Sequence, residues 1–164
     1  MDTLLPAADR IARLLKDSGR TLAVSESSAG GLIAAALLSV PGASAYFRAG
    51  AVVYTRAARV GLMGIGDEAM QSMRSSSEPY ALLLANTART RFRADWGLAE
   101  TGASGPDGNR YGDPAGHACI AVVGDGVERV ITLRTGSADR LANMRAFAGA
   151  ALAQLEAALA GRPG

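Results

Sequence analysis

The sequence predicts an α/β protein in which helices cover both faces of a mixed sheet, giving a three-layer α/β/α architecture. Short apolar segments of strand length alternate with longer segments that carry apolar residues at helical spacing. Two of the short segments run directly into small-residue turns that contain Gly, which is common at strand ends in α/β proteins. A Gly-Asp-Gly turn signal at 124–126 adds an antiparallel hairpin, so we expect the sheet to be mixed.

The first part of the chain predicts a helix, a strand and a second helix. Apolar residues at helical spacing between positions 4 and 15 predict an amphipathic helix that ends at Ser18-Gly19. Residues 21–24 form a short, β-competent run and predict the first buried strand. A polar, Gly-containing turn at 25–31 then leads into an Ala/Leu-rich helix expected at 32–40.

The middle of the chain predicts a second strand and two more helices. Residues 49–54 form the expected strand, and Thr55 suits the N-cap of a short helix through Leu62. Residues 64–77 are rich in Ser, Met and Gly and predict a loop with one helical turn. Pro79 fits the first turn of a long helix that ends near Arg93.

The last part of the chain predicts three strands and a final helix. The strands are expected at 96–101, 117–123 and 127–134, and the Ala-rich helix from Asp139 to about Leu159. Its apolar residues, Leu141 and Met144 among them, are more typical of a core face than of an interface. Because no repeat or linker divides the chain, we expect one domain over residues 1–164.

Composition argues against several classes of protein. The formal net charge is only +2 and the arginines are spread along the chain, which does not favour nucleic-acid binding. The N-terminus lacks the pattern of a signal peptide, and the longest apolar run is too short to span a membrane. Cys119 is the only cysteine, so no intrachain disulfide is possible and a cytoplasmic location is expected.

Two Gly-rich turns are the candidate sites for chemistry. The first, at 26–31, places serines where a strand leads into a helix, so a serine there could act as a nucleophile or simply cap the helix. Backbone N–H groups at such a turn also attract anions. The second turn, at 101–106, could admit a ligand close to the backbone or be a tight turn alone.

The remaining reactive side chains suggest no metal site and no cofactor. His117 and Cys119 share one face of a predicted strand, but two ligands are fewer than zinc requires. Cys119 lies in an apolar run and is expected to be a buried thiol. Lys16 is the only lysine and lies in the first predicted helix, away from both turns.

Five stretches of the chain, in order, resemble the C-terminal domain of the competence-damage protein CinA, the nicotinamide-nucleotide amidase family. The resemblance spans most of residues 5–155. The matching pairs are AVSESSAGG at 23–31 with AESCTGG, VPGASAYF at 40–47 with VPGSSxxF, AVVYTR at 51–56 with VxYSN, TGASGP at 101–106 with TGxAGP, and DPAG at 113–116 with KPxGxVxIA.

The resemblance implies hydrolysis of a carboxamide, with nicotinamide mononucleotide (NMN) converted to nicotinate mononucleotide and ammonia. It implies a serine nucleophile at Ser27, a tyrosine at Tyr54, and a base at the position of Arg59, where the family has lysine. It also implies a substrate-binding pocket made by the two turns and the last helix. The residues concerned are Glu26, Ser28, Gly30, Gly31, Thr101, Gly102, Ser104, Gly105 and Arg145.

Arg59 is the departure that matters most for the chemistry. A general base needs a pKa near the working pH, whereas arginine stays charged in proteins. Arg59 could hold a phosphate or carboxylate, but it should not take a proton from Ser27. His117, Tyr54 and Glu26 are alternative bases, each with a structural explanation as well; for Glu26 that explanation is hydrogen bonding to turn amides.

Two further departures and one ambiguity concern binding. The family's turn threonine is Ala29 here and its alanine in TGxAGP is Ser104, so the site has lost one hydroxyl and gained another. Arg140 and Arg145 both lie in the last helix, about 140° apart around its axis. Arg145 is the better match to the family's arginine near the nucleotide phosphate, although a solvated surface arginine is an equal alternative.

Three functional hypotheses follow. The first is an amidohydrolase acting on NMN with Ser27 as nucleophile. The second is a nucleotide-binding module that has lost catalysis through Arg59, and the third is an amidase that has moved to another substrate. The family forms homo-oligomers, so by resemblance we also expect a homodimer or a higher homo-oligomer.

Overall fold

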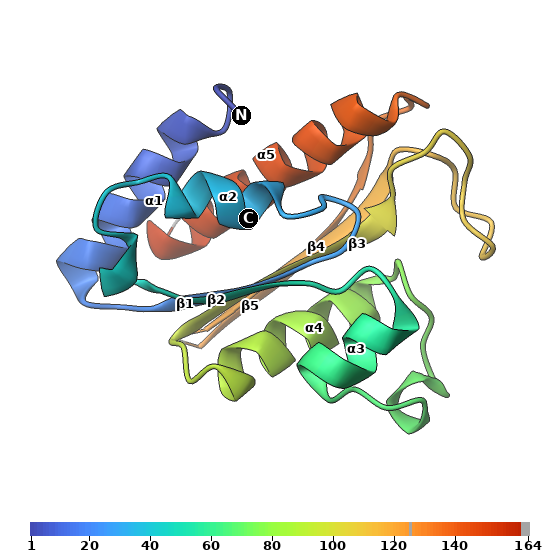
Figure 1. The fold of residues 1–164 in the computed structure, drawn as a ribbon, viewed down its shortest axis with the longest axis horizontal. Helices are drawn as coiled ribbons and strands as arrows, with labels where there is room; N and C mark the ends of the chain where they lie inside the picture. The colour runs from blue at the N-terminus through green and yellow to red at the C-terminus, as the bar shows by residue number, and fades with distance from the viewer. Residues whose placement is uncertain (125, 162–164) are drawn as a thin grey trace.

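The computed structural model describes residues 1–124 and 126–161, and it has a five-stranded mixed sheet between two layers of helices (Figure 1). The strand order is β2-β1-β3-β4-β5. Strand β1 is parallel to β2 and to β3, whereas β4 is antiparallel to both of its neighbours, β3 and β5. The predicted three-layer α/β/α arrangement is therefore confirmed. The strands are β1 (Leu22–Glu26), β2 (Phe47–Val52), β3 (Trp96–Ala103), β4 (His117–Gly124) and β5 (Val127–Arg134).

The helices divide between the two faces of the sheet. Figure 1 shows α1, α2 and α5 on one face, and α3 and α4 on the other. Two short 3-10 turns, Ala43–Ala45 and Glu68–Met70, interrupt the loops. None of the helices in the described ranges is long and apolar enough to cross a membrane. The helices are α1 (Leu5–Ser18), α2 (Leu32–Leu38), α3 (Arg56–Met63), α4 (Glu78–Arg91) and α5 (Arg140–Leu159).

Local sequence signals explain where most helices begin and end. Thr55 and Asp139 accept hydrogen bonds from amides in the first turns of α3 and α5, and Ser77 does the same for α4, as N-caps should. Gly19 ends α1 at a φ of 63°, in the left-handed region that glycine tolerates. The predicted cap at Thr55 is thus confirmed, whereas Asp139, predicted as the first residue of the last helix, is its N-cap.

Two strands are longer than the sequence predicted, and this changes where the turns begin. Strand β1 continues through Ser25 and Glu26, and β3 continues through Gly102 and Ala103. Parallel pairing with both neighbours keeps β1 extended beyond its apolar run. The hairpin between β4 and β5 is confirmed by their antiparallel pairing, although Asp125 in its turn, like the last three residues of the predicted domain, lies outside the described residues.

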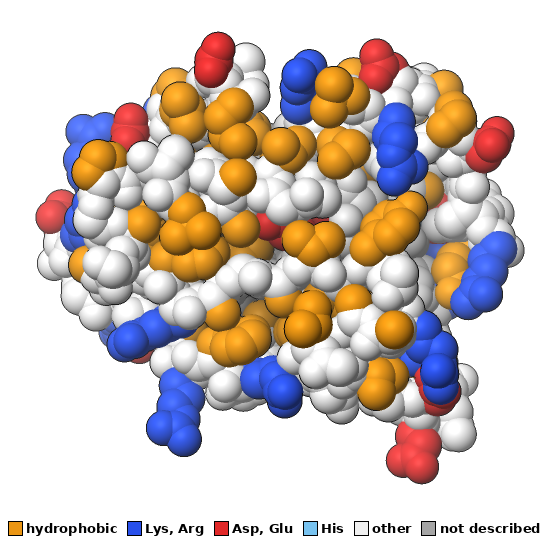
Figure 2. Space-filling model, viewed as in Figure 1, with side chains coloured by type: hydrophobic (Ala, Val, Ile, Leu, Met, Phe, Trp, Pro, Cys, Tyr) orange, Lys and Arg blue, Asp and Glu red, His pale blue; other side chains and the backbone are white. Residues whose placement is uncertain are grey.

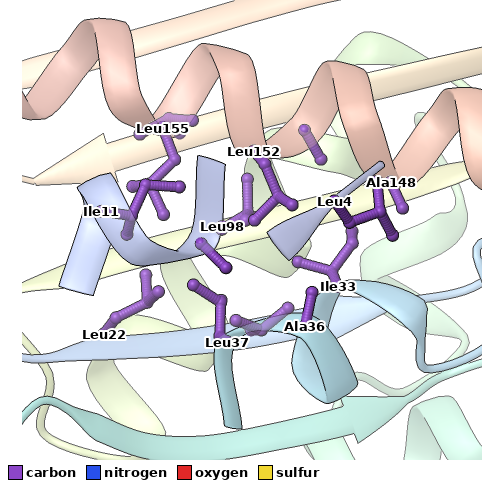
Figure 3. Packing of buried hydrophobic residues seen from close by; sticks show 14 of the residues in the cluster. Leu4, Ile11, Leu22, Ile33, Ala36, Leu37, Leu98, Ala148, Leu152 and Leu155 are labelled. Atoms are coloured by element: carbon purple, nitrogen blue, oxygen red, sulfur yellow. The ribbon is translucent and has the colours of Figure 1, made fainter. Parts of the chain in front are cut away.

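The larger core lies between the sheet and the α1, α2 and α5 layer. Figure 3 shows Leu22 and Leu98 of the sheet pointing toward Ile33 and Leu37 of α2 and Leu152 of α5. Each of these side chains has 0% exposure. The apolar stripe of α5 is therefore core for Ala148, Leu152 and Leu155, as predicted, whereas Leu141 is 50% exposed.

The second core lies between the sheet and α4, and it depends on glycine. A Cβ atom at Gly97 would lie 2.1 Å from the carbonyl oxygen of Ala85 in α4. Because backbone atoms on both sides would have to move, we expect Gly97→Ala to lower the free energy of unfolding by roughly 1–3 kcal/mol.

Urea unfolding checks this prediction, with Gly61→Ala as the control. Position 61 lies in α3, where an added Cβ meets nothing within 4 Å. That substitution should raise stability by about 0.5–1 kcal/mol through helix propensity. Equal stability of Gly97→Ala and the unmodified protein would show that α4 does not pack this closely on β3.

Candidate functional site

A cavity of about 600 Å³ opens at the carboxyl ends of β1 and β3, on the side of the sheet that α3 and α4 cover. This volume is in the range of small-molecule sites. Ser27, Tyr54, Arg59, Thr101 and Gly102 all line the cavity, so the structure brings together residues that were predicted from distant segments. The other lining residues are Val53, Thr55, Arg56, Asp67, Met70, Met73, Arg74, Ser75, Ser76, Tyr80, Arg110 and Tyr111.

The alternation of side chains along β1 explains why Ser27 reaches this cavity. Ala23 packs in the core beneath α4, whereas Leu22 and Val24 pack in the core beneath α1, α2 and α5. Successive residues of a strand point to opposite faces. Ser27 therefore continues on the α4 side, while Glu26 and Ser28 continue on the opposite side.

Glu26 is fully buried and holds the N-terminus of α2. Its Oε2 atom accepts hydrogen bonds from the amides of Gly31 and Ile33, each at 3.0 Å, and Oε1 accepts from the amide of Ala34 at 2.8 Å. Burial raises the pKa of Glu26, and these hydrogen bonds oppose the rise. The alternative interpretation of Glu26 from the sequence, bonding to turn amides, is therefore confirmed.

A second buried carboxyl, Glu100 of β3, holds the turn that carries Ser27. The register aligns Ser25 with Ala99, so Glu100 lies one position farther along, beside the turn. Its Oε2 accepts from the amides of Ser27 at 3.1 Å and Ala29 at 2.8 Å, and its Oε1 accepts from the hydroxyl of Ser28. Burial raises the pKa of Glu100 to about 7.

No role was predicted for Glu100 from the sequence. The signal was present, because a carboxyl stands inside the otherwise uncharged strand segment Trp96–Ala103. Acidic residues are almost never fully buried unless they are paired. That rule alone would have marked Glu100 for attention, but it would not have named its partners across the sheet.

Arg59 is buried and engaged in an ion pair. Its side chain is 9% exposed, and one terminal nitrogen donates to Oδ1 of Asp67. Arg56 donates to the same carboxylate, with Nε 2.9 Å from Oδ1. These hydrogen bonds, the Arg56 one first, lower the pKa of Asp67. The guanidinium that replaces the family's lysine is thus held by a carboxylate that stays ionised.

Arg74, Arg110 and Tyr111, here called the far wall of the cavity, supply positive charge and an aromatic ring. The guanidinium groups of Arg74 and Arg110 lie 5.4 and 5.0 Å from the ring centre of Tyr111. Arg110 also donates to the Tyr111 hydroxyl at 2.9 Å, and this bond is the main reason that the pKa of Tyr111 is lowered. Arg74 pairs with Asp113 behind the wall. Four arginines and one aspartate line the described cavity, so its net charge is positive.

The loop residue Ser76 links this wall to β3 and β4. Its amide donates to the Thr101 hydroxyl, and its own hydroxyl donates to the carbonyl of Gly102, both at 3.3 Å. His117 lies behind it, with Nε2 2.9 Å from the Ser76 carbonyl and 3.7 Å from the sulfur of Cys119. Both side chains are buried, which confirms the buried-thiol prediction for Cys119 and a structural position for His117.

Several predicted binding residues lie beside the cavity without lining it. Gly30 and Gly31 have φ values of 67° and 98°, so the turn needs glycine for its backbone conformation. Ser104 is buried, and its hydroxyl lacks a hydrogen-bond partner within the described residues. Gly105 accepts a hydrogen bond from an arginine of α5 through its carbonyl.

The arginine of α5 that donates to the Gly105 carbonyl is Arg140. Its guanidinium donates to the Gly105 carbonyl at 2.7 Å and to the Tyr54 hydroxyl at 3.3 Å, so it joins the second turn to a residue that lines the cavity. Arg145, which the resemblance favoured, is exposed on α5. Its part in binding stays a prediction. Lys16 lies away from the cavity and donates to the carbonyl of Pro41 at 2.7 Å.

Within the described ranges, no three His, Cys, Asp or Glu side chains gather as a metal site would require. Figure 2 shows one face of the molecule, where the charged side chains, Lys and Arg as well as Asp and Glu, are scattered mostly toward the rim and hydrophobic side chains gather nearer the centre.

The sequence profile of the CinA C-terminal domain matches residues 5–159. The chain belongs to the CinA C-terminal domain family. A "CinA-like protein" from Gloeobacter violaceus is 42% identical over 136 residues, covering 83% of this chain and 31% of that protein. Another from Chlorobium limicola is 35% identical over 148 residues, covering 88% of this chain and 34% of the relative. This CinA domain thus spans about a third of the curated relatives it matches.

Solved structures agree with the CinA fold. A competence-damaged protein (CinA) superfamily protein from Klebsiella pneumoniae has a TM-score of 0.89 at 27% identity, covering 96% of this chain and 98% of that one. The competence/damage inducible protein CihA from Agrobacterium tumefaciens has a TM-score of 0.87 at 32% identity, covering 96% and 95%. The predicted family and fold are therefore confirmed.

Proposed function

We propose that this CinA domain is a nicotinamide-nucleotide amidohydrolase-like protein that binds an NMN-like nucleotide in the 600 Å³ cavity. The observation that carries the proposal is that Ser27 lines the same cavity as Tyr54 and position 59, which lie in a different segment; the family resemblance assigns all three to catalysis. The ligand chemistry of the far wall supports the same assignment.

The far wall suits the two ends of such a ligand. Arginine binds phosphate through paired N–H donors, and Arg74 and Arg110 stand together over Tyr111. The tyrosine rings that line the cavity offer faces against which a flat pyridine ring can stack. A ligand bound by its phosphate to these arginines would lie in the same cavity that Ser27 lines.

The proposed reaction begins at the Ser27 hydroxyl. Its oxygen attacks the carboxamide carbon, the C–N bond breaks, and ammonia leaves after taking up a proton. Water then hydrolyses the acyl-serine to release the carboxylate and restore the hydroxyl. The proton of the attacking hydroxyl needs an acceptor, and Arg59, paired with Asp67, stays charged and cannot serve.

The ion pair between Arg59 and Asp67 favours a second candidate function, a nucleotide-binding module that does not hydrolyse its ligand. In that case the cavity still binds the nucleotide, but hydrolysis has been lost because Arg59 stands where the family has its lysine base. An amidase with another amide substrate is the third hypothesis, but the Ser104 hydroxyl that suggested it is buried beside the cavity and does not line it. Nucleotide binding is common to the first two.

Ser27→Ala separates binding from turnover. We expect the variant to bind NMN within about threefold of the unmodified protein, because one hydroxyl contributes little to ground-state binding. Ammonia release should fall at least about 100-fold, to the level of the background, because the nucleophile is gone. Titration calorimetry measures the first quantity and an ammonia assay with purified protein the second.

The outcome of that comparison assigns the function. Ammonia release that depends on Ser27 supports the amidohydrolase. Saturable binding with equal background release from both proteins supports the binding module, and binding to neither protein contradicts both. A cytoplasmic location, a homo-oligomeric state and the absence of nucleic-acid and membrane partners belong to the same proposal.

A further inference from the structure

The amides of the Ser27 turn are already occupied by internal carboxyl groups. Backbone N–H groups at a strand-to-helix turn commonly bind an anion from a ligand. Here Glu26 takes three amides of the α2 N-terminus, and Glu100 takes the amides of Ser27 and Ala29 together with the Ser28 hydroxyl. The turn is therefore held from behind, on the face of the sheet away from the cavity.

We propose that Glu100 is the positioning residue that fixes the Ser27 turn, and that its proton sets how firmly the turn is held near neutral pH. The inference rests on the proposed function only for the role given to Ser27. The hydrogen bonds between Glu100 and the turn do not depend on the proposed function. Glu100 accepts hydrogen bonds from the amides of Ser27 and Ala29 and from the hydroxyl of Ser28, so it holds three consecutive residues of the turn.

The neutral form of Glu100 satisfies all three of these partners. In the structure Oε2 accepts from the amides of Ser27 and Ala29, and Oε1 accepts from the hydroxyl of Ser28. When the carboxyl is protonated at Oε1, the bond to Ser28 can reverse, because a serine hydroxyl also accepts. The ionised form keeps the acceptors but places a second charge beside Glu26 in a site without exposed surface. Losing the proton therefore adds repulsion where the turn begins.

Among the charged groups on the elements around Glu100, Glu26 is the one whose charge raises the pKa of Glu100. Strand β4 presents Ile120 opposite Glu100, and α2 carries no charged residue. On α5, Arg140 is held by Gly105, Arg145 is exposed, and Glu156 pairs with Arg10. Glu26, bonded to three amides at a helix N-terminus, is the better-stabilised anion of the two carboxyl groups.

Three variants test the proposal through amide hydrogen exchange of the segment 25–34, corrected for intrinsic exchange. Glu100→Gln copies the neutral form, because its carbonyl accepts from both amides and its NH₂ group donates to Ser28. Glu100→Ala removes every bond to the turn. Glu68→Gln is the control, because Glu68 is exposed in the loop before α4.

We expect Glu100→Ala to exchange at least about tenfold faster than the unmodified protein in this segment, and Glu100→Gln to restore the protection. From about pH 6 to about pH 8 the unmodified protein and Glu68→Gln should lose protection relative to Glu100→Gln. The melting temperature of the unmodified protein should fall as pH rises from about 4.5 to about 7 and level off above that, because only the folded protein holds the Glu100 proton in this range. A carboxyl whose pKa is raised on folding stabilises the fold at low pH and loses that contribution as pH rises through about 7.

Two results would overturn the proposal. If Glu100→Gln showed the same pH dependence as the unmodified protein, the titrating group would be another residue. If Glu100→Ala folded and kept full protection of the segment, the turn would not depend on Glu100. An absence of NMN binding in all proteins would contradict the proposed function instead, and the exchange comparison would still decide the role of Glu100.

Discussion

Replacing Arg59 with lysine is expected to raise the rate of NMN hydrolysis. Residue 59 lines the same cavity as Ser27, so an amine at this position lies within the site where a proton must be removed. Lysine can lose its proton when buried, whereas the arginine that stands there cannot. Positioned general bases contribute roughly 100- to 10,000-fold to rates, and we expect a gain at the lower end of this range.

Asp67 is the reason that we expect the rate of hydrolysis to rise by about 100-fold rather than more. Its carboxylate, which now pairs with Arg59, would keep a lysine at position 59 in the charged form. The double substitution Arg59→Lys with Asp67→Asn should therefore exceed the single one. The pH–rate profile should shift to lower pH, because the lysine then gives up its proton more readily.

An ammonia assay measures both effects, and two variants control them. Arg56→Lys alters the other arginine that pairs with Asp67, on the same cavity wall, and should give no gain. Adding Ser27→Ala to the double variant should return the rate to background. A rate that stays at background in the double variant would mean that the cavity has lost more than its base, which favours the binding module.

The order of helices and strands could be predicted from the sequence because each element carries its own local signal. The caps at Thr55 and Asp139 and the turn between β4 and β5 depend on a few adjacent residues. The ends of β1 and β3 depend on pairing with distant strands, so those boundaries were predicted too early. Glu26 lies in β1 and Gly102 lies in β3, although the sequence predicted both residues in turns.

The candidate site could be predicted only where the family motifs extend. Those motifs gave Ser27, Tyr54 and Thr101, which meet at the cavity. They did not include Arg74 or Tyr111, because the loops that carry these residues meet only in the folded protein. Whether Arg140 or Arg145 faces the second turn depends on the rotation of α5, which sequence spacing alone does not determine.

The buried carboxyl groups of Glu26 and Glu100 limit which amides of the site are free to bind an anion. In the turn predicted to attract a ligand's anion, the amides of Ser27, Ala29 and Gly31 are bonded to Glu100 or Glu26, and Glu26 also bonds two amides of α2. Under the proposed function, the arginine side chains that line the cavity would recognise the ligand's anion instead. Binding should accordingly weaken with rising salt, as expected for guanidinium groups that are partly open to solvent.

The largest expected loss of stability follows from Glu26→Ala. The side chain of Glu26 is 0% exposed and bonds three amides at the start of α2. Alanine would leave these donors without partners inside the protein and would open a cavity beside them. Each unsatisfied buried donor costs about 1–3 kcal/mol, and after partial relaxation we expect a loss of roughly 3–5 kcal/mol in the free energy of unfolding.

Urea unfolding of Glu26→Ala, Glu26→Gln and Glu68→Ala measures this loss and assigns its cause. Gln can accept through one oxygen only, so Glu26→Gln should fall between the alanine variant and the unmodified protein. Glu68→Ala changes an exposed carboxyl and should stay within about 0.5 kcal/mol of the unmodified protein. If Glu26→Ala and Glu68→Ala were equally stable, the amides of α2 would have found other partners, and the anchoring role given to Glu26 would be wrong.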